Sequence, residues 1–494
     1  MLARFLSLFS TSTAPPPDGV RTIPCTAMDL GMVDLILTMG LVIDARLDAK
    51  KLQETLSTVV ERKFPRAGGR LSLRNGVYEL QVPDSFGPAA PPMVFTTEDY
   101  AESYKSDKRP EIPTHPTGAL PSPPAIIARP AELDVYLRSV TCPRSLEGFL
   151  TPNMPLLHVH VAVFDNLTFI GVTSPHIAFD ALGTATLLSA WTRLLNGEEL
   201  DTIPGMDRDA EPFKTFAGSS SISAKRGWFN LGLFNRLSFI ARFVLHIIQD
   251  SSEVPYLVRV PKTFLDGTKQ NIMDELNREG SNEWVGSSDV LMAWWFKTLY
   301  THRKHDDTTP IHIHFPVDLR NKPIWADGAP LTSPYIHNAV SKISLPPIPA
   351  NAFQTESLAA LALRVRRAVN AYTADPAAIR ADVQWHCAHP GMTLFPCPPG
   401  AEYNVQTNWR AACFAGLDFS GARAASPPGA AAADTLERAA RVVFVHPIVT
   451  SGKNIPMRGT GGVLMDDEHG VWMSQYRGAK DWERVRQSGS LVFL

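Results

Sequence analysis

Apolar and polar positions alternate along the chain with two different periods, which predict interleaved strands and helices. Leu37 to Ile43 is mostly apolar and predicts a strand. Asp48 to Arg62 carries apolar residues at helical spacing, with Asp48 as the expected N-cap. Leu156 to Phe164 alternates strictly, as a half-buried strand does, and Leu167 to Val172 follows after a short Asp-Asn turn. The last two stretches therefore predict a β-hairpin.

Further along the chain the same two periods recur. Asp180 to Leu195 predicts a helix, and Ser287 to Arg303 predicts another, with Ser287 or Ser288 as its cap. Thr309 to Phe315 predicts a strand. Because helices and strands interleave without regular βαβ spacing, the pattern favours α/β layers with mixed sheets over a barrel or a doubly wound fold.

Several stretches between these elements predict loops. Proline removes a backbone donor and disfavours helix in the residue before it, so the proline clusters at Pro83 to Pro130 and Pro390 to Pro399 predict surface loops. Ser219 to Ser223 is a polar linker, and the alanine-rich Ala422 to Ala433 predicts a mobile inserted loop.

Composition narrows the class of protein. The chain has 494 residues, 44% of them apolar and 19% charged, which is enough apolar surface for a large core. Its net charge is −2, so no basic excess favours nucleic acid as a partner. The five cysteines are odd in number and lack CxxC spacing, which argues against a zinc site and against a disulfide framework. We expect a reduced, cytoplasmic setting.

Two apolar segments raise the question of membranes. The apolar run within Met1 to Ser10 is shorter than a signal peptide needs, so we prefer to interpret this segment as a flexible tail. The alternative is a signal or transit peptide. Trp228 to Ile248 is long and apolar, but it contains Arg236 and Arg242, which disfavour a transmembrane helix. We expect a partly buried connecting helix there, and the alternative is a helix lying on a membrane surface.

Common catalytic signatures are missing from the sequence. It contains no GxSxG, HExxH, P-loop or EF-hand pattern, and Gly459 to Gly462 lacks the third glycine of a dinucleotide site, which indicates a turn. Two histidine pairs alternate along strands, His158 with His160 and His312 with His314, and each pair could chelate a metal from one strand face. No third ligand is suggested nearby, so we expect partly buried strand histidines and no metal.

His176 differs from the other histidines because it lies where a predicted strand ends and a helix begins. Asp180 follows four residues later, at the start of that helix, where the helix dipole favours a carboxylate. A neutral imidazole at such a junction is a candidate general base. The alternative is an ordinary strand-end histidine followed by an N-capping aspartate, because an HxxxD pattern alone is common.

The surrounding motifs make the HxxxD pattern specific. In its motifs and their order the chain resembles the BAHD-type acyl-CoA-dependent acyltransferases, especially their fungal secondary-metabolite branch of trichothecene O-acetyltransferase type. The matches are HxxxD at His176 to Asp180, a helix and PlAGRL-like segment at Leu52 to Leu71, an SxxDxLxAxxWK-like helix at Ser287 to Lys297, DxR at Asp318 to Arg320, GNA at His337 to Ala339, TSW at Thr407 to Trp409, and DFGWG at Asp418 to Ala422. The TSW and DFGWG blocks depart from the family pattern and read Thr-Asn-Trp and Asp-Phe-Ser-Gly-Ala.

The resemblance implies a fold of two chloramphenicol-acetyltransferase-like domains, each a mixed sheet flanked by helices, with a channel between them. The implied first domain covers residues 1–200, a crossover covers 201–260 and the second domain covers 261–494, with part of 418–450 packing back on the first. Acyl-CoA, by default acetyl-CoA, would enter the channel from one face as a co-substrate, and a small hydroxylated acceptor would enter from the other. The implied protein has no permanently bound cofactor and acts as a monomer.

The resemblance also implies roles for individual residues. His176 would act as general base without a covalent acyl-enzyme, and Asp180 would point away from the substrate into a salt bridge with Arg320. Thr407, or more weakly the Trp409 indole, would donate to the oxyanion. The alternative for Thr407 is that its hydroxyl only satisfies a strand-end backbone group. The block that begins at Asp418 would be structural and distant from the chemistry.

Three alternatives to this function remain open. A condensation-type, amide-forming relative would carry HHxxxDG, but Pro175 and Ala181 occupy the positions of its first histidine and its glycine. A non-catalytic binding protein on the same scaffold, associated with membranes through Trp228 to Ile248, is the second alternative. Acylation of an amine instead of a hydroxyl is the third.

Overall fold

A five-stranded sheet forms the part of the fold that leads to His176. The computed structural model describes residues 18–105, 108–113, 123–217, 227–424, 439–452, 456–489 and 491–493. The expected N-terminal tail, the linker at Ser219 to Ser223 and most of the alanine-rich loop lie outside these residues. The strands of this sheet, in spatial order, are β14 (Val442–Ser451), β2 (Leu35–Ile43), β8 (Thr168–Pro175), β7 (His158–Val163) and β5 (Val94–Asp99).

The predicted hairpin is present as β7 and β8, which pair antiparallel from His158 opposite Thr173 to Val163 opposite Thr168. The prediction of a half-buried strand is wrong for β7, because all six of its residues are buried. Its outer face is covered by α3 (Asp134–Leu137) and by an apolar cluster around Phe164 and Phe169. The polar positions of the alternating pattern are therefore buried histidines.

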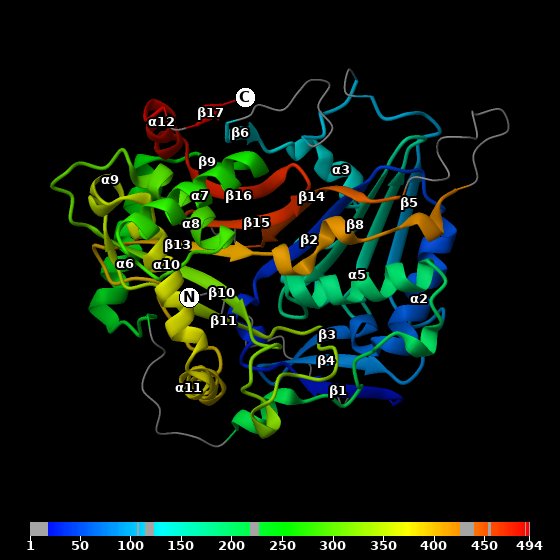
Figure 1. Ribbon diagram of the computed structural model, residues 1–494. Helices are drawn as coiled ribbons and strands as arrows, with labels where there is room; N and C mark the ends of the chain where they lie inside the picture. Colours follow the sequence, from blue (N-terminus) through cyan, green and yellow to red (C-terminus); the bar gives the residue numbers. More distant parts are fainter. Residues whose placement is uncertain are drawn as a thin grey trace.

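Two amphipathic helices cover the other face of this sheet, α2 (Ala49–Lys63) and α5 (Ala181–Leu195), as Figure 1 shows. The side chain of Asp48 accepts from the Lys50 and Lys51 backbone N–H groups, so the predicted N-cap of α2 is confirmed. The apolar residues at helical spacing, which face the core, are all buried: Leu52, Leu56, Val59 and Val60. Their burial anchors α2 against α5 and the sheet.

A nine-stranded mixed sheet forms the other half of the molecule (Figure 1). Within it β10, β13 and β15 run parallel, and the pairs β10–β11, β15–β16, β16–β9 and β9–β6 are antiparallel. The strands in spatial order are β11 (Val340–Ser344), β10 (Pro310–Asp318), β13 (Glu402–Asn408), β15 (Thr460–Asp467), β16 (Gly470–Gly478), β9 (Glu253–Pro261), β6 (Ala125–Ala128) and β17 (Val492–Phe493), with β12 (Ile348–Pro349) beside β10.

The second core lies between this sheet and its helices, and it buries Trp295, Phe296 and Phe353 among other large apolar side chains. The longer helices of this half are α7 (Lys262–Arg278), α8 (Ser287–Tyr300), α10 (Leu358–Thr373), α11 (Pro376–Ala388) and α12 (Ala479–Gln487). The short helices α4 (Leu146–Phe149) and α9 (Ala352–Thr355) join neighbouring elements. The α/β architecture of two mixed sheets with flanking helices is the fold class that the sequence predicted.

Each half contributes a strand to the other sheet. β14, near the C-terminus, pairs with β2 along its length, and β6, from the N-terminal part, pairs with β9. A small third sheet, β1 (Val20–Pro24), β4 (Val77–Pro83) and β3 (Arg70–Arg74), completes the fold. The chain therefore holds the two halves together by strand exchange as well as by side-chain packing.

Three local predictions were wrong. Gly459 to Gly462 is not simply a turn, because β15 begins at Thr460 and the sheet interior needs glycine there: a Cβ at Gly462 would lie 2.2 Å from the Thr407 hydroxyl. Helix α8 is capped at Gly286, whose N–H donates to Asp289, and not at a serine. The proline-rich range from Pro83 to Pro130 contains the strands β5 and β6, which lie between its prolines.

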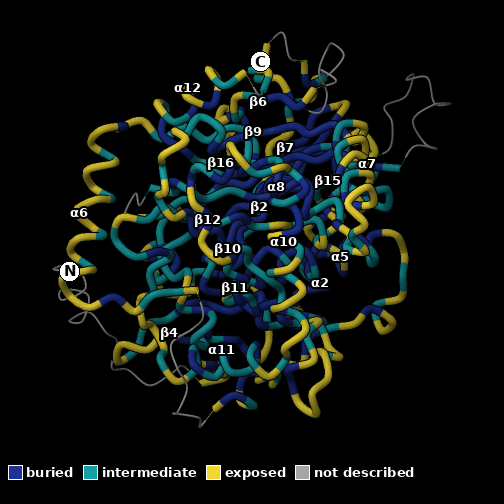
Figure 2. The backbone as a smooth tube through the Cα atoms, turned by 60° about the vertical axis from the view of Figure 1, so that its left-hand side comes forward, coloured by how far each residue is buried: buried dark blue, intermediate teal, exposed yellow. Residues whose placement is uncertain are grey.

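The helix expected at Trp228 to Ile248 is α6 (Leu233–Gln249), and it is more exposed than the predicted partly buried helix, because only Arg236, Phe239, Phe243 and Ile247 are partly buried. None of its residues is buried, and Figure 2 shows it as an exposed element at the edge of the molecule. Sequence alone overestimated its burial because its apolar residues surround most of the helix. Among the described residues, no helix combines the length and apolar character that a membrane crossing needs.

Candidate active site

The site is organised around the turn that joins β8 to α5, where His176 lies. The His176 backbone N–H donates to the Leu35 carbonyl at 2.8 Å, and Ala178 N–H donates to the Pro175 carbonyl at 2.9 Å. Asp180 then caps α5, because its Oδ1 accepts from Gly183 N–H at 2.7 Å. The turn is therefore fixed at both ends by backbone hydrogen bonds.

Asp180 is buried, and its carboxylate is fully occupied by groups other than His176. The Arg320 Nη2 donates to both carboxylate oxygens at 2.9 Å, and Ala339 N–H donates to Oδ2 at 3.0 Å. The predicted contact with Arg320 is thus present. Asp180 therefore caps α5 and pairs with Arg320 at the same time, so the interpretation as an N-cap and the interpretation as an ion-pair partner both hold.

Arg320 is held by several further acceptors. Its Nη1 donates to Asp318 at 2.7 Å, its Nε donates to the Tyr335 carbonyl at 2.7 Å, and its Nη2 also donates to the His337 carbonyl at 2.7 Å. Burial lowers the pKa of this guanidinium, but the charges of Asp180 and Asp318 outweigh that effect and raise it overall. The side chain therefore remains a cation that connects β10 to the start of α5.

Asn338 connects the same turn to the N-terminal region. Its Nδ2 donates to the His176 carbonyl at 2.9 Å and to the buried carboxylate of Asp29 at 3.0 Å. Burial raises the pKa of Asp29 to about 6, although its hydrogen bonds from Asn338 and Thr26 act in the opposite direction. The backbone at His176 is therefore held from both halves of the chain.

Sequence reasoning missed Asp29. The pattern Thr26-x-x-Asp29 is a capping signal, and Asp29 does accept from both the N–H and the hydroxyl of Thr26 at 2.7 Å. That signal predicts a helix start only. The contact with Asn338, 309 residues away, arises from the tertiary structure.

The imidazole of His176 is partly buried, and its surroundings favour the neutral form over the protonated one. Burial lowers the pKa of His176 below its ordinary value, while its own backbone, the Asp180 charge and the Asn338 side chain act in the opposite direction. Its Nδ1 is buried and makes no hydrogen bond among the described residues. Because Nδ1 is enclosed by protein atoms, Nε2 is the candidate ring nitrogen for contact with a ligand.

A close backbone contact sets the distance between α5 and the segment that precedes Asn338. A Cβ added to Gly183 would lie 1.8 Å from the Ile336 carbonyl oxygen. Beside it, His337 is buried, stacks on Phe179 with centroids 5.8 Å apart, and donates from Nδ1 to the Ala178 carbonyl at 2.8 Å. Burial lowers the pKa of His337 to about 3, so this second histidine is neutral and structural.

Thr407 and Trp409 lie elsewhere, at the C-terminal end of β13 in the nine-stranded sheet. The Thr407 hydroxyl donates to the Gly461 carbonyl at 3.3 Å, which is the backbone contact that the alternative interpretation expected. Trp409 N–H donates to the Val463 carbonyl at 2.9 Å, and its ring packs 6.4 Å from that of Phe414. Both residues are half-buried, and the contacts of each are made with neighbouring elements and not with His176.

The block that begins at Asp418 packs against the C-terminal end of α5. Asn196 donates to the Asp418 carbonyl and accepts from Gly421 N–H, both at 2.8 Å, and Phe419 packs edge-on against Trp191. A helix of 15 residues is about 22 Å long. This block therefore lies far from His176.

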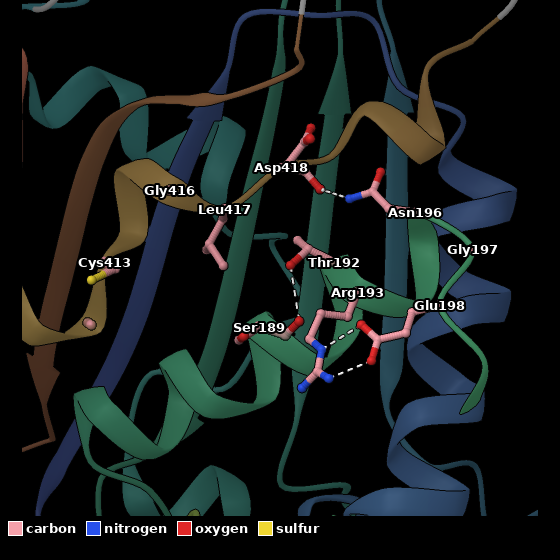
Figure 3. A pocket seen from close by; sticks show the side chains of 11 residues that line it. Ser189, Thr192, Arg193, Asn196, Gly197, Glu198, Cys413, Gly416, Leu417 and Asp418 are labelled. Atoms are coloured by element: carbon pink, nitrogen blue, oxygen red, sulfur yellow. Dashed lines mark hydrogen bonds and ion pairs between the residues drawn. The ribbon is translucent and has the colours of Figure 1, made fainter. Parts of the chain in front are cut away.

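A cavity of about 590 Å³ opens at this same end of α5 (Figure 3). It contains no imidazole. Two of its three charged side chains, Arg193 and Glu198, pair with each other, and the carboxylate of the third, Asp418, accepts from the N–H and the hydroxyl of Ser420. Its lining is Ser189, Thr192, Arg193, Asn196, Gly197, Glu198, Ala412, Cys413, Gly416, Leu417 and Asp418. Because both carboxylates are already engaged and the length of α5 separates the cavity from His176, we do not place the chemistry here.

The paired histidines make ordinary structural contacts. His160 hydrogen-bonds through Nδ1 to the Thr96 hydroxyl at 2.8 Å, and His314 hydrogen-bonds to the Ser344 hydroxyl and the Pro396 carbonyl, both at 2.8 Å. His158 packs edge-on against Phe149, and burial lowers its pKa to about 4. No group of three potential ligands that could hold a metal occurs among the described residues.

The segment that contains His176 matches a known protein family. The model of the Transferase family matches residues 147–423, more than half of the chain, including His176, Asp180, Arg320 and Thr407. The chain belongs to the Transferase family. Common descent therefore explains why the sequence motifs occur in the order typical of this family.

Relatives in sequence agree with this assignment, and a solved structure shares the fold. Acetyltransferase adrJ of Penicillium rubens is 28% identical over 383 residues, which cover 74% of this chain and 75% of that protein. O-acyltransferase ausP of Aspergillus calidoustus is 25% identical over 487 residues, 95% of each chain. The Transferase-family chain also shares its fold with TRI101 of F. sporotrichioides, whose crystal structure contains coenzyme A and T-2, at a TM-score of 0.62 and 14% identity, covering 94% of this chain and 96% of that one.

Proposed function

We propose that this protein is an acyl-CoA-dependent O-acyltransferase that transfers an acyl group, acetyl by default, to a hydroxyl of a small secondary metabolite. The observation that carries the proposal is the arrangement at the β8–α5 turn. Asp180 is engaged by Arg320 and two backbone N–H groups, so it holds the loop and leaves the His176 imidazole as the base. The acetyltransferase and O-acyltransferase relatives support the reaction class.

The reaction requires removal of a proton from a weakly acidic alcohol. The His176 Nε2 takes this proton as the hydroxyl oxygen attacks the thioester carbon, a role that contributes about 10²–10⁴-fold in rate. The C–S bond of the tetrahedral intermediate then breaks, and the imidazolium returns the proton to the CoA thiolate. Burial favours neutral His176, which keeps the base competent before each turnover. No covalent acyl-enzyme is needed, because both substrates meet at one base.

For the oxyanion we propose Thr407 as donor, with the Trp409 indole as the weaker candidate. The Thr407 hydroxyl has only a long 3.3 Å bond to the Gly461 carbonyl, so it can rotate toward a better acceptor. Loss of such a donor typically costs about 2.7–4 kcal/mol of transition-state stabilisation. Asp418 remains structural in this scheme because its block packs at the far end of α5.

We further propose a division into an N-terminal domain of residues 1–200, a crossover of 201–260 and a C-terminal domain of 261–494, which together form one working unit. The pair Asp180 and Arg320 joins the two domains within a single chain. We propose that this chain acts as a monomer. All five cysteines are free thiols, which supports a reducing, cytoplasmic setting.

The deciding experiment measures release of free CoA thiol from acetyl-CoA in the presence of a panel of hydroxylated and amine acceptors. The wild-type protein should release CoA with hydroxylated acceptors, and His176→Ala should lower kcat by about 10²-fold or more while the protein remains folded. His469→Ala, at an exposed histidine, is the matched control and should leave kcat unchanged. Release with amines alone would indicate N-acylation, and near-normal turnover of folded His176→Ala would contradict the proposal.

A further inference from the structure

Among the described residues, α6 carries more exposed large apolar side chains than any other helix or strand. Thirteen large apolar side chains are exposed in the described chain, and seven of them lie on this one helix of 17 residues. Their exposed fractions run from 46% at Val244 to 85% at Phe234. The seven residues, which we call the α6 apolar face, are Leu233, Phe234, Leu237, Ile240, Val244, Leu245 and Ile248.

The helix is held firmly, so this exposure does not come from a poorly attached segment. On its inner side, Phe239 packs edge-on against Phe395 with centroids 5.0 Å apart, and Phe243 stacks on Phe239. Phe229, just before the helix, exchanges two backbone hydrogen bonds with Phe395. These contacts fix one side of α6 against the loop at Phe395 and direct the opposite side outward.

The C-terminal end of α6 is anchored just as well. Arg458 donates to the carbonyls of His246 and Asp250, and the buried Asp250 carboxylate accepts from the Lys480 N–H at the start of α12. His246 lies 3.9 Å from Asp481. The two acidic groups at this end are therefore directed toward the protein and not toward the α6 apolar face.

The arrangement around the helix axis is that of an interfacial helix. At 100° per residue, the arc from Ile240 to Leu245 spans about 140° and contains only apolar side chains. The neighbouring arc is polar and contains Arg242 and Asn235, both exposed. No aspartate or glutamate occurs in residues 233–249, and Arg236 and Arg242 are its permanent cations.

We propose that α6 lies on an anionic lipid bilayer and binds this chain peripherally to a membrane surface. Helices that carry arginine on the polar face and leucine and phenylalanine on the other insert about 5–10 Å into the headgroup boundary. The exposed cation of Arg242, on a helix without acidic residues, complements the negative charge of anionic lipid. α6 lies at the edge of the molecule, and none of its residues is buried (Figure 2).

A second copy of the chain fits this face less well. A stable protein interface uses roughly 20–30 residues on each side, whereas the α6 apolar face offers seven large side chains on one helix. The apolar arc is also broader than the narrow stripe that a helix–helix seam occupies. A bilayer, which is flat and fluid, can cover the whole arc.

The test is co-sedimentation of the full-length protein with phosphatidylcholine vesicles that contain phosphatidylserine, compared with vesicles of phosphatidylcholine alone. Wild-type protein should bind the anionic vesicles, and the double variant Leu237→Asp/Ile248→Asp should lower that affinity by about tenfold or more. Arg242→Gln should weaken binding to anionic vesicles and leave binding to neutral vesicles unchanged. All of these side chains are exposed, so the variants should fold as the wild type does.

The matched control is Val77→Asp/Val140→Asp, which places the same charge at two exposed apolar positions outside α6 and should bind vesicles normally. Failure of the wild type to bind either vesicle, or equal binding by the α6 double variant, would overturn the proposal. So would a dimer in sedimentation velocity that the α6 variant dissolves, or vesicle binding that appears only after removal of residues 1–17. Turnover of acetyl-CoA with a water-soluble acceptor should be unchanged in the variants, which separates this proposal from the proposed function.

Discussion

Arg320 donates to both carboxylate oxygens of Asp180 at 2.9 Å, although the two residues are 140 positions apart in the chain. This pair fixes the N-terminus of α5 against the end of β10. Since Asp180 also accepts from Ala339 N–H, the carboxylate ties three separate segments together. The turn that presents His176 is thus positioned by an aspartate that does not itself contact the imidazole.

The first prediction concerns the loss of the Asp180 charge. Asp180→Asn preserves shape but leaves the mostly buried Arg320 without its main counter-charge, and loss of one partner of a buried pair costs about 3–5 kcal/mol. We expect a lower melting temperature together with a lower kcat, measured by calorimetry and by CoA release. Asp266→Asn, which breaks an exposed pair with Lys262, is the control and should change stability by less than about 1 kcal/mol. Equal melting temperatures for the two variants would refute the structural role.

A second prediction uses the close contact at Gly183. In Gly183→Ala the new methyl group would overlap the Ile336 carbonyl oxygen, so α5 must shift and move Asp180 with it. We expect loss of about 1–3 kcal/mol or more of unfolding free energy and a fall in kcat. The control is Gly267→Ala in α7, where a Cβ meets nothing within 4 Å and helix propensity should add about 0.5–1 kcal/mol. If both alanine variants stabilised the fold, the contact would have no importance.

The third prediction is a pH profile. A base must be unprotonated to act, and burial lowers the pKa of His176 below its ordinary value of 6.5. The acid limb of kcat/KM should therefore have its midpoint below pH 6.5, with full activity at neutral pH. Asp29, with its pKa raised to about 6, takes up a proton in the same region, which weakens its hold on Asn338 and steepens the fall. An acid limb centred above pH 7 would show that His176 is not the base in this environment.

The fourth prediction separates the two interpretations of Thr407. Thr407→Val removes the hydroxyl with little change in volume, and it should lower kcat far more than it changes KM for acetyl-CoA, because the lost interaction exists only in the transition state. Thr407→Ser keeps the hydroxyl and should retain most of the activity. If the valine variant keeps its kcat and loses only stability, the hydroxyl serves the Gly461 carbonyl alone.

Local sequence signals predicted local structure well. The spacing of Leu52, Leu56, Val59 and Val60 and the capping aspartate before them specify α2 through contacts within a few residues. The β7–β8 hairpin follows from alternation around a short turn. Both signals act over a few residues, so no distant part of the chain is needed to interpret them.

Part of the candidate site was also predicted, but from the resemblance to a family and not from local periodicity or capping. HxxxD and DxR were identifiable because their order resembles a known family, and the resemblance supplied the contact between Asp180 and Arg320. Asp29 carried only a capping signal, so its link through Asn338 to the His176 carbonyl was not predictable. A hydrogen bond between residues 309 apart depends on how two sheets come together, which no local pattern records.

The burial of individual elements likewise depends partly on the local sequence and partly on the tertiary structure. The sequence by itself determined where α2, α5 and the β7–β8 hairpin form, because propensity, capping and periodicity operate within a few residues. Only the tertiary structure decided that β7 is covered on both faces, that β14 and β6 exchange between sheets, and that α6 presents its apolar side to solvent. An apolar side chain leaves water as favourably in a protein core as in a membrane. Which of the two it contacts therefore depends on the elements that pack around it.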